Sequence, residues 1–279
     1  MTDDLGKFRF SSPAEVAELL LGVNYLPSSE ICSVLFLADR LRKPVLVEGP
    51  AGTGKTELAK STAKALGARL IRLQCHEGID ESKALYEWNY KKQLLRIQAD
   101  GNSASWSDVE ANIFSEEFLL QRPLLQAIRA EDPVVLLIDE VDRVETETEA
   151  LLLEVLSDYQ VSIPELGTMV ANQVPLVFLT SNNTRELSEA LKRRCLFLFL
   201  DYPDKEREME IVLSKISGVS EVLAESIVSF VASLRELDLK KRPSISETLD
   251  WALTLVNLGL DDIDEQVAKS TLNVLLKYR

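Results

Sequence analysis

Residues 49–56, Gly-Pro-Ala-Gly-Thr-Gly-Lys-Thr, fit the pattern G-x-x-x-x-G-K-[ST] of a phosphate-binding loop. Glycines let such a backbone curl so that its N–H groups reach phosphate oxygens, and the following helix adds the positive end of its dipole. Lys55 is expected to neutralise the β- and γ-phosphates, and Thr56 is expected to ligate Mg²⁺. A glycine-rich turn without a ligand is the alternative explanation. The expected nucleotide contacts are Gly49, Pro50, Ala51, Gly52, Thr53, Gly54, Lys55, Thr56 and Glu57.

A second candidate site follows the apolar run Val134 to Ile138, which ends in Asp139 and Glu140. Carboxylates at the carboxyl end of a parallel strand lie where α/β sheets bind ligands. Asp139 is expected to hold Mg²⁺, and Glu140 is expected to polarise the attacking water. Taken alone, the pair also fits a solvated strand end, but downstream of a phosphate-binding loop it favours hydrolysis. No Asn-Lys-x-Asp string supports guanine specificity.

The elements that position these residues alternate between short apolar runs and helical patterns, which is typical of an α/β fold with a parallel sheet. Strands are expected at 45–47, 70–73, 134–138, 176–180 and 196–200, and helices at 57–66, 119–130 and 147–156. Beyond residue 203 only helices are expected, at 205–215, 220–235, 246–258 and 264–278. The pattern predicts a nucleotide-binding domain over residues 1–203 and a small helical domain over 204–279.

Composition excludes several classes of protein. The 279 residues are 46% hydrophobic and 27% charged, as in soluble globular proteins. A net charge of −14 disfavours general binding to nucleic acid or to anionic membranes. Three cysteines far apart and a single histidine favour neither a disulfide framework nor a zinc site. We therefore expect a cytoplasmic protein, and no apolar run is long enough to span a membrane.

The chain resembles an AAA+ ATPase, specifically the MoxR branch found beside von Willebrand A domain proteins. The resemblance rests on residues 49–56, on Leu137 to Asp142, on Phe178 to Leu187 and on Arg242-Pro243-Ser244. It implies a P-loop NTPase αβα sandwich with a parallel five-stranded sheet, followed by an all-helical lid. It also places the adenine pocket near residues 22–25.

The same resemblance assigns roles to polar residues outside the first two motifs. Asn182, with Asn183 as the alternative, matches sensor 1, which orients the attacking water. Arg194, with Arg193 as the alternative, matches the arginine finger that reaches a neighbouring subunit's site. Arg242 is expected to contact the nucleotide as sensor 2 from a shifted position, because this sequence departs from the MoxR pattern, which carries that arginine a few residues after the small-domain loop. Each also has a simpler interpretation, as a strand-end turn, a basic surface turn or an ordinary loop cation.

Two inserts are expected from the resemblance. Residues 77–105 correspond to the helix 2 insert, in which Tyr86, Trp88 and Tyr90 alternate at strand period and fit either a partner contact or a buried strand face. Residues 159–175 contain two extended stretches around Gly167 and predict a hairpin before the sensor 1 strand.

Together these features predict an ATP- and Mg²⁺-dependent ATPase that forms a homo-oligomeric ring, a hexamer by resemblance, and that remodels or activates a protein substrate like a chaperone. A von Willebrand A domain protein is the expected partner, and no nucleic acid or membrane is expected as one. The alternatives are an assembly switch with slow hydrolysis and a DNA-associated AAA+ subunit, which the net charge opposes.

Overall fold

A five-stranded parallel sheet forms the centre of the structure, a computed structural model that describes residues 8–100 and 113–276. The strand order is β2-β5-β8-β1-β9. The strands are β1 (Val45–Glu48), β2 (Arg69–Gln74), β5 (Val134–Asp139), β8 (Leu176–Ser181) and β9 (Leu196–Phe199). The predicted strands are confirmed, and so is the predicted parallel sheet. The continuous apolar runs of β5 and β8 are buried along their whole length because helices cover both faces.

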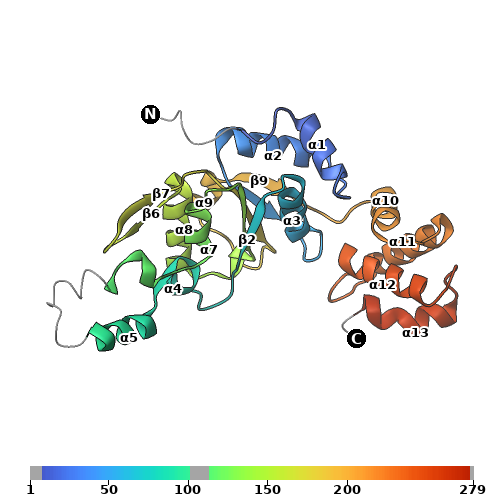
Figure 1. Cartoon of the computed structure of the whole chain (residues 1–279). Helices are drawn as coiled ribbons and strands as arrows, with labels where there is room; N and C mark the ends of the chain where they lie inside the picture. The colour runs from blue at the N-terminus through green and yellow to red at the C-terminus, as the bar shows by residue number, and fades with distance from the viewer. Residues whose placement is uncertain (1–7, 101–112, 277–279) are drawn as a thin grey trace.

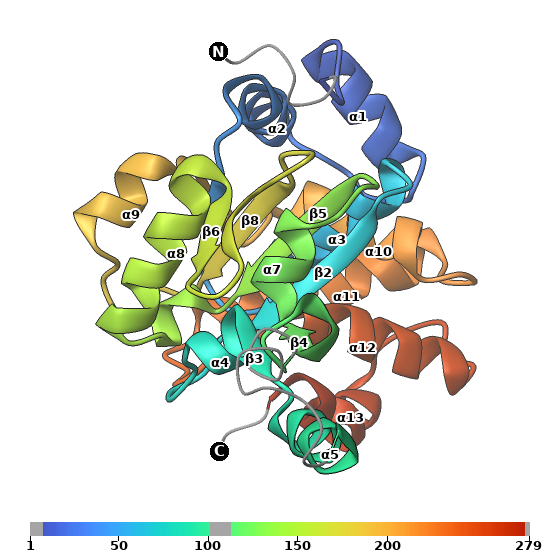
Figure 2. The same ribbon diagram turned by 60° about the vertical axis from the view of Figure 1, so that its left-hand side comes forward.

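Side chains of successive strand residues point to opposite faces, so each strand contributes to two apolar cores. Val135 and Leu137 belong to one core, and Leu136 and Ile138 belong to the other. The first core is covered by α1 (Pro13–Leu21), α2 (Ser29–Leu41) and α3 (Lys55–Ala65), and the second by α7 (Pro123–Ile128), α8 (Thr146–Asp158) and α9 (Glu189–Arg194) (Figure 2). The αβα sandwich of the prediction is confirmed.

Between the last strand and residue 276, where the described part of the chain ends, the regular elements are all helices. These are α10 (Lys205–Lys215), α11 (Glu221–Glu236), α12 (Ile245–Asn257) and α13 (Glu265–Leu275). They enclose their own apolar core around the fully buried Trp251, whose indole N–H donates to Thr271 Oγ1 at 2.8 Å. Figure 1 shows these four helices grouped beyond α3 (orange to red). We call residues 205–276 the helical lid. Tyr278, the expected end of the last helix, lies outside the described residues.

Two small antiparallel pairs extend from the sandwich. One joins β6 (Gln160–Ile163) to β7 (Gly167–Val170), within the segment expected to form a hairpin. The other joins β3 (Tyr86–Trp88) to β4 (Leu119–Gln121), and between them lie α5 (Tyr90–Asp100) and η2 (Glu116–Phe118). A short helix, α4 (Glu81–Ala84), precedes β3. Residues 101–105 of the expected insert lie outside the described part of the chain.

Two local predictions are wrong. The helix expected over 119–130 is instead a strand, β4, followed by α7, which begins at Pro123. Proline disfavours helical backbone in the residue before it, and Arg122 is accordingly extended (φ −93°, ψ 173°). The expected aromatic row also breaks, because β3 ends at Trp88 and Tyr90 opens α5.

Among the described residues, no helix combines the length and apolar character needed to cross a membrane.

A buried ion pair fixes the helices of the lid to one another. Arg235 of α11 donates from Nη1 and Nη2 to the two carboxylate oxygens of Glu208 on α10, at 2.5 and 2.8 Å. Thr248 of α12 donates to the same carboxylate at 2.7 Å. Arg235 Nε also donates to the carbonyl oxygen of Pro243 at 2.8 Å, so the pair holds the loop that leads into α12. The Glu208 side chain is 1% exposed and the Arg235 side chain is 12% exposed.

We expect Arg235→Met to lower the free energy of unfolding by about 3–5 kcal/mol, because it leaves the Glu208 carboxylate buried without its counter-ion. Urea unfolding followed by circular dichroism measures the change. Lys269→Met is the matched control, since Lys269 pairs with Glu265 on the lid surface at high exposure and should leave the unfolding curve unchanged. Equal unfolding curves for the two variants would show that the buried pair contributes no more than a surface pair.

Candidate nucleotide-binding site

The loop between β1 and α3 curls around the Lys55 side chain. Lys55 is buried, and its Nζ donates to the carbonyl oxygens of Gly49 and Pro50, both at 2.7 Å. Burial lowers the pKa of Lys55, whereas the charges of Asp142, Asp139 and Glu140 act to raise it. Gly52 and Gly54 have φ values of 78° and 94°, which L-residues with side chains rarely adopt. The sequence of the loop thus produces a tight turn with a cation at its centre.

Asp139, the last residue of β5, gathers hydrogen bonds from separate elements. Its Oδ1 accepts from Thr56 Oγ1 at 3.0 Å and from Thr180 Oγ1 at 2.5 Å. Its Oδ2 accepts from Arg72 Nε at 3.0 Å and from Arg72 Nη2 at 2.5 Å. The strand order explains this convergence, because β2 and β8 flank β5 and their carboxyl ends meet at one edge of the sheet.

Glu140 follows with a left-handed backbone (φ 58°), which is uncommon for a residue other than glycine. Its N–H donates to Thr180 Oγ1 at 2.9 Å, and its Oε2 pairs with Arg143 Nε at 2.9 Å. Thr180 thereby links Asp139 and Glu140, donating to the first and accepting from the second. Strained backbone of this kind is found most often at functional sites.

Asp142 fixes the loop that follows β8. Its Oδ2 accepts from Asn182 N at 3.2 Å, from Thr184 N at 2.9 Å and from Thr184 Oγ1 at 2.6 Å. Burial acts to raise the pKa of Asp142, but these hydrogen bonds outweigh burial and the pKa lies below its ordinary value. Asp142 is therefore ionised at neutral pH and holds Asn182 at the edge of the site.

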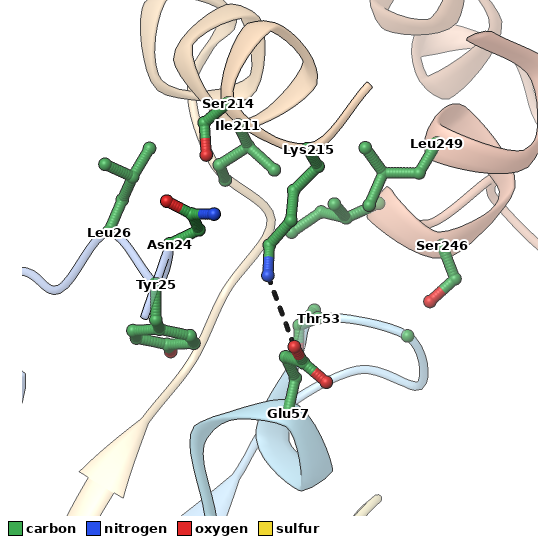
Figure 3. Close-up of a pocket in the computed structure, with 13 residues that line it drawn as sticks. Asn24, Tyr25, Leu26, Thr53, Glu57, Ile211, Ser214, Lys215, Ser246 and Leu249 are labelled. Carbon is green, nitrogen blue, oxygen red and sulfur yellow. Dashed lines mark hydrogen bonds and ion pairs between the residues drawn. The ribbon is translucent and has the colours of Figure 1, made fainter. Parts of the chain in front are cut away.

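Two cavities, each of about 320 Å³, meet at the loop. The polar cavity is lined mainly by charged and hydrogen-bonding side chains: Lys55, Thr56, Lys60, Arg72, Asp139, Glu140, Thr180 and Asn182. The apolar cavity lies between the loop, the segment before α2 and the helical lid, and its lining includes Asn24, Tyr25, Leu26, Thr53, Ile211, Ser214, Lys215, Ile245 and Leu249 (Figure 3). Gly52, Gly54, Glu57 and Ser246 line both cavities.

The helical lid contacts the loop through the start of α12. Ser244 caps this helix and accepts from the backbone of residue 247, and its own N–H donates to Glu247 Oε2 at 3.0 Å. A Cβ placed on Gly52 would lie 2.0 Å from Ser244 Oγ, so only glycine fits at this contact. On the apolar side, Lys215 Nζ of the lid pairs with Glu57 Oε1 of α3 at 3.3 Å (Figure 3).

Residues 44–195, more than half of the chain, match the family described as AAA domain (dynein-related subfamily). The chain belongs to this family. An uncharacterized protein of Staphylococcus saprophyticus is 24% identical over 227 residues, which cover 79% of this chain and 78% of that protein. The denitrification regulatory protein NirQ of Pseudomonas aeruginosa is 26% identical over 228 residues, 78% of each chain.

One solved structure that the fold resembles is the Thermotoga maritima RuvB Holliday junction branch migration motor. The alignment covers 96% of this AAA chain and 73% of the RuvB chain, with 20% sequence identity and a TM-score of 0.47.

The structure brings most of the predicted site residues of this AAA domain together. Lys55, Thr56, Asp139, Glu140 and Asn182 all line the polar cavity. Asn183, the alternative to Asn182, has a left-handed backbone (φ 57°) and lines neither cavity.

The predicted arginines lie elsewhere. Arg242 is exposed and lines neither cavity, and Ser246 is the lid residue at the polar cavity instead. Lys192 and Arg193 pair with Glu186 and Glu189, at 3.3 and 3.8 Å. Arg194, at the end of α9, is exposed and has no ion pair among the residues that the structure describes.

Sequence reasoning missed Arg72, Thr180 and Ser246. Arg72 interrupts the apolar run of β2, and Thr180 ends the apolar run of β8, so each left a weak signal. Ser246 left none, since its place depends on how α12 packs against the loop.

We expect Gly52→Ala to destabilise the nucleotide-free protein more than Gly54→Ala. Both substitutions force a side chain into left-handed backbone, at about 1–2 kcal/mol each. Only the methyl group at position 52 collides with Ser244, since a Cβ at Gly54 has no neighbour within 4 Å, and overpacking adds roughly 1–3 kcal/mol. Chemical denaturation measures both changes. Combining Gly52→Ala with Ser244→Gly in a double-mutant cycle should remove the part of the destabilisation that comes from the collision. If the effects of the two substitutions on the free energy of unfolding simply add, the contact does not contribute.

Proposed function

We propose that this protein is an ATP-binding AAA+ ATPase of MoxR type whose subunits form a ring and use ATP hydrolysis to remodel or activate a partner protein. One observation carries the proposal. A buried lysine, a carboxylate pair and an asparagine, contributed by separate segments, line one polar cavity that adjoins an apolar cavity. A nucleotide has the same division, an apolar base at one end and phosphates at the other.

The residues present fit ATP. The apolar cavity between Tyr25, Ile211 and Leu249 would take the base, and the phosphates would lie along the loop. Lys55 Nζ already bonds carbonyl oxygens at the centre of the loop and would neutralise the β- and γ-phosphates. The amino end of α3, which begins at Lys55, adds further positive potential.

The residues also fit Mg²⁺. Thr56 Oγ1 and Asp139 Oδ1 are hard oxygen donors 3.0 Å apart, and Mg²⁺ is bound through few protein oxygens together with waters and substrate phosphates. Thr56 and Asp139 would therefore hold the ion. When bound, Mg²⁺ supplies neutralisation of the charge that develops on the phosphate oxygens.

Glu140 and Asn182 would each have a role in the hydrolysis of ATP. The oxygen of a water molecule bonds to the γ-phosphorus, the bond from this phosphorus to the β,γ-bridging oxygen breaks, and ADP leaves with the electron pair. Glu140 would accept the proton of the water, and Asn182 would orient that water. Thr180 would support the first of these roles, because it holds the backbone N–H of Glu140 beside the carboxylate of Asp139.

A ring explains the position of Arg194. It is exposed at the end of α9 and lines neither cavity of its own chain, so it would act on the site of a neighbouring subunit. An arginine supplied in this way stabilises the charge of the transition state. We propose that the ring is a hexamer.

A partner protein is the proposed object of the cycle, with a von Willebrand A domain protein as its adaptor. Helix α5 in the first insert supports a protein contact, because Tyr90, Leu94 and Leu95 are large, apolar and exposed. We propose a cytoplasmic location, which agrees with three cysteines that are all free; burial raises the pKa of Cys75 and Cys195 to about 12.

We expect Glu140→Gln to bind ATP with nearly the affinity of the natural chain and to lose most of its turnover, by roughly 10²–10⁴-fold, because the amide cannot accept the proton. Lys55→Ala should lose binding itself, since Lys55 supplies the cation at the centre of the loop. Phosphate release and equilibrium binding of ATP measure the two effects. Undiminished turnover in Glu140→Gln would refute the assignment of the base.

We expect Arg194→Ala to lower turnover by about 10³-fold or more while leaving ATP binding intact. Subunits carrying Arg194→Ala should regain turnover when mixed with Glu140→Gln subunits, because each variant supplies the group that the other lacks. Arg193→Ala is the matched control, since Arg193 pairs with Glu189 on the same surface. A mixture that shows no recovery at any ratio argues against action between subunits.

A further inference from the structure

Arg72 is a cation in the polar cavity with no role in the proposed chemistry. It lies on β2, two residues before the strand's end at Gln74, whose register partner is Asp139. Its Nε and Nη2 both donate to Asp139 Oδ2, at 3.0 and 2.5 Å, and Nη2 also donates to Gln74 Oε1. The guanidinium therefore covers one oxygen of the carboxylate that would hold Mg²⁺.

The pair joins a buried acid to an exposed base. Asp139 already accepts hydrogen bonds from Thr56 and Thr180 on Oδ1, and Arg72 reaches only Oδ2. The side chain of Asp139 is 4% exposed, whereas that of Arg72 is 46% exposed. An arginine exposed to this degree can leave its partner at modest cost, because water solvates the released guanidinium.

Mg²⁺ and the guanidinium compete for the same negative charge. Two cations on one carboxylate repel each other strongly in a partly buried site, so the entry of the ion must weaken the Arg72 contact. The freed guanidinium stays in the cavity that would hold the phosphates, where oxygens of the nucleotide can accept its hydrogen bonds.

We propose that Arg72 is a latch on Asp139 Oδ2 that the charge of Mg²⁺ at Oδ1 must weaken, and that it thereby raises the concentration of Mg²⁺ that the site requires. The inference rests on the proposed binding of ATP. It assigns Arg72 a positioning role: the guanidinium occupies Asp139 Oδ2 before the ion arrives, and it lowers the affinity for the ion.

The test is the affinity of the protein–ADP complex for the metal, measured with the full chain by titrating Mg²⁺ into protein saturated with ADP. Mn²⁺ provides a second readout, because its electron paramagnetic resonance signal reports free ion directly. We expect Arg72→Gln to bind either ion about tenfold more tightly, since a charge-assisted contact no longer competes. Arg72→Lys retains a cation without the forked donors and should fall between Arg72→Gln and the natural chain.

Lys60→Gln is the matched control. Lys60 lies on α3, lines the same polar cavity and has no contact with Asp139 in the part of the chain that the structure describes. Like Arg72→Gln, Lys60→Gln removes one positive charge from the polar cavity. It should change metal affinity by less than about threefold, which is the effect of a solvated charge.

Unchanged metal affinity in Arg72→Gln would overturn the latch. Weaker affinity would also overturn it, because Arg72 would then prepare Asp139 for the ion rather than compete with it. Equal tightening in Lys60→Gln would trace the effect to the overall charge of the cavity. Failure of the natural chain to bind ADP at any Mg²⁺ concentration would refute the proposed function itself, a result that differs from normal ADP binding with unaltered metal affinity.

Discussion

The structure depends above all on how one buried carboxylate, Asp139, is satisfied. An isolated charge in such a place would be costly, and it becomes tolerable only with donors around it. Those donors come from α3, β8 and β2. Helix α3, which follows the phosphate-binding loop, is thereby tied to the sheet at the point where chemistry is proposed. Packing of the apolar strands brings their ends together, and the polar contacts then fix the ends to within hydrogen-bond distance.

A second constraint links the loop to the helical lid. Ser244 packs on Gly52 so closely that no side chain fits between them, and Ser246 lines both cavities. The Pro243 carbonyl before this helix is held by Arg235, whose guanidinium also stands 5.1 Å from the ring of Tyr202 in the segment joining sheet and lid. Any movement of α12 relative to the loop must therefore change both cavities together. In the proposed function, a nucleotide that fills these cavities would therefore contact the lid at the start of α12.

The sequence predicts contiguous features well and assembled ones poorly. The strands and the loop were found because each is encoded in a few adjacent residues, whether as an apolar run or as glycines with a lysine. Arg72 and Thr180 became part of the site only through the strand order, which places β2 and β8 beside β5. Arg242 was expected at the nucleotide from its place in the chain, whereas the packing of α12 presents Ser246. The prediction of a helix over 119–130 is wrong for a local reason, since the constraint that Pro123 puts on the backbone of Arg122 outweighs the helical pattern around it.

The net charge of −14 also acquires a local meaning. Charges in salt water act over about 10 Å, so the potential that a nucleotide meets is set by the cavity rather than by the whole surface. There Lys55, Lys60 and Arg72 line the same cavity as Asp139 and Glu140. Carboxylates and cations are thus interleaved in this cavity. The balance of positive and negative charge in the cavity depends on which cation neutralises Asp139. An acidic protein can in this way receive a polyanion at one place, and in the proposed function a divalent ion that accompanies ATP would complete the neutralisation that the side chains leave partial.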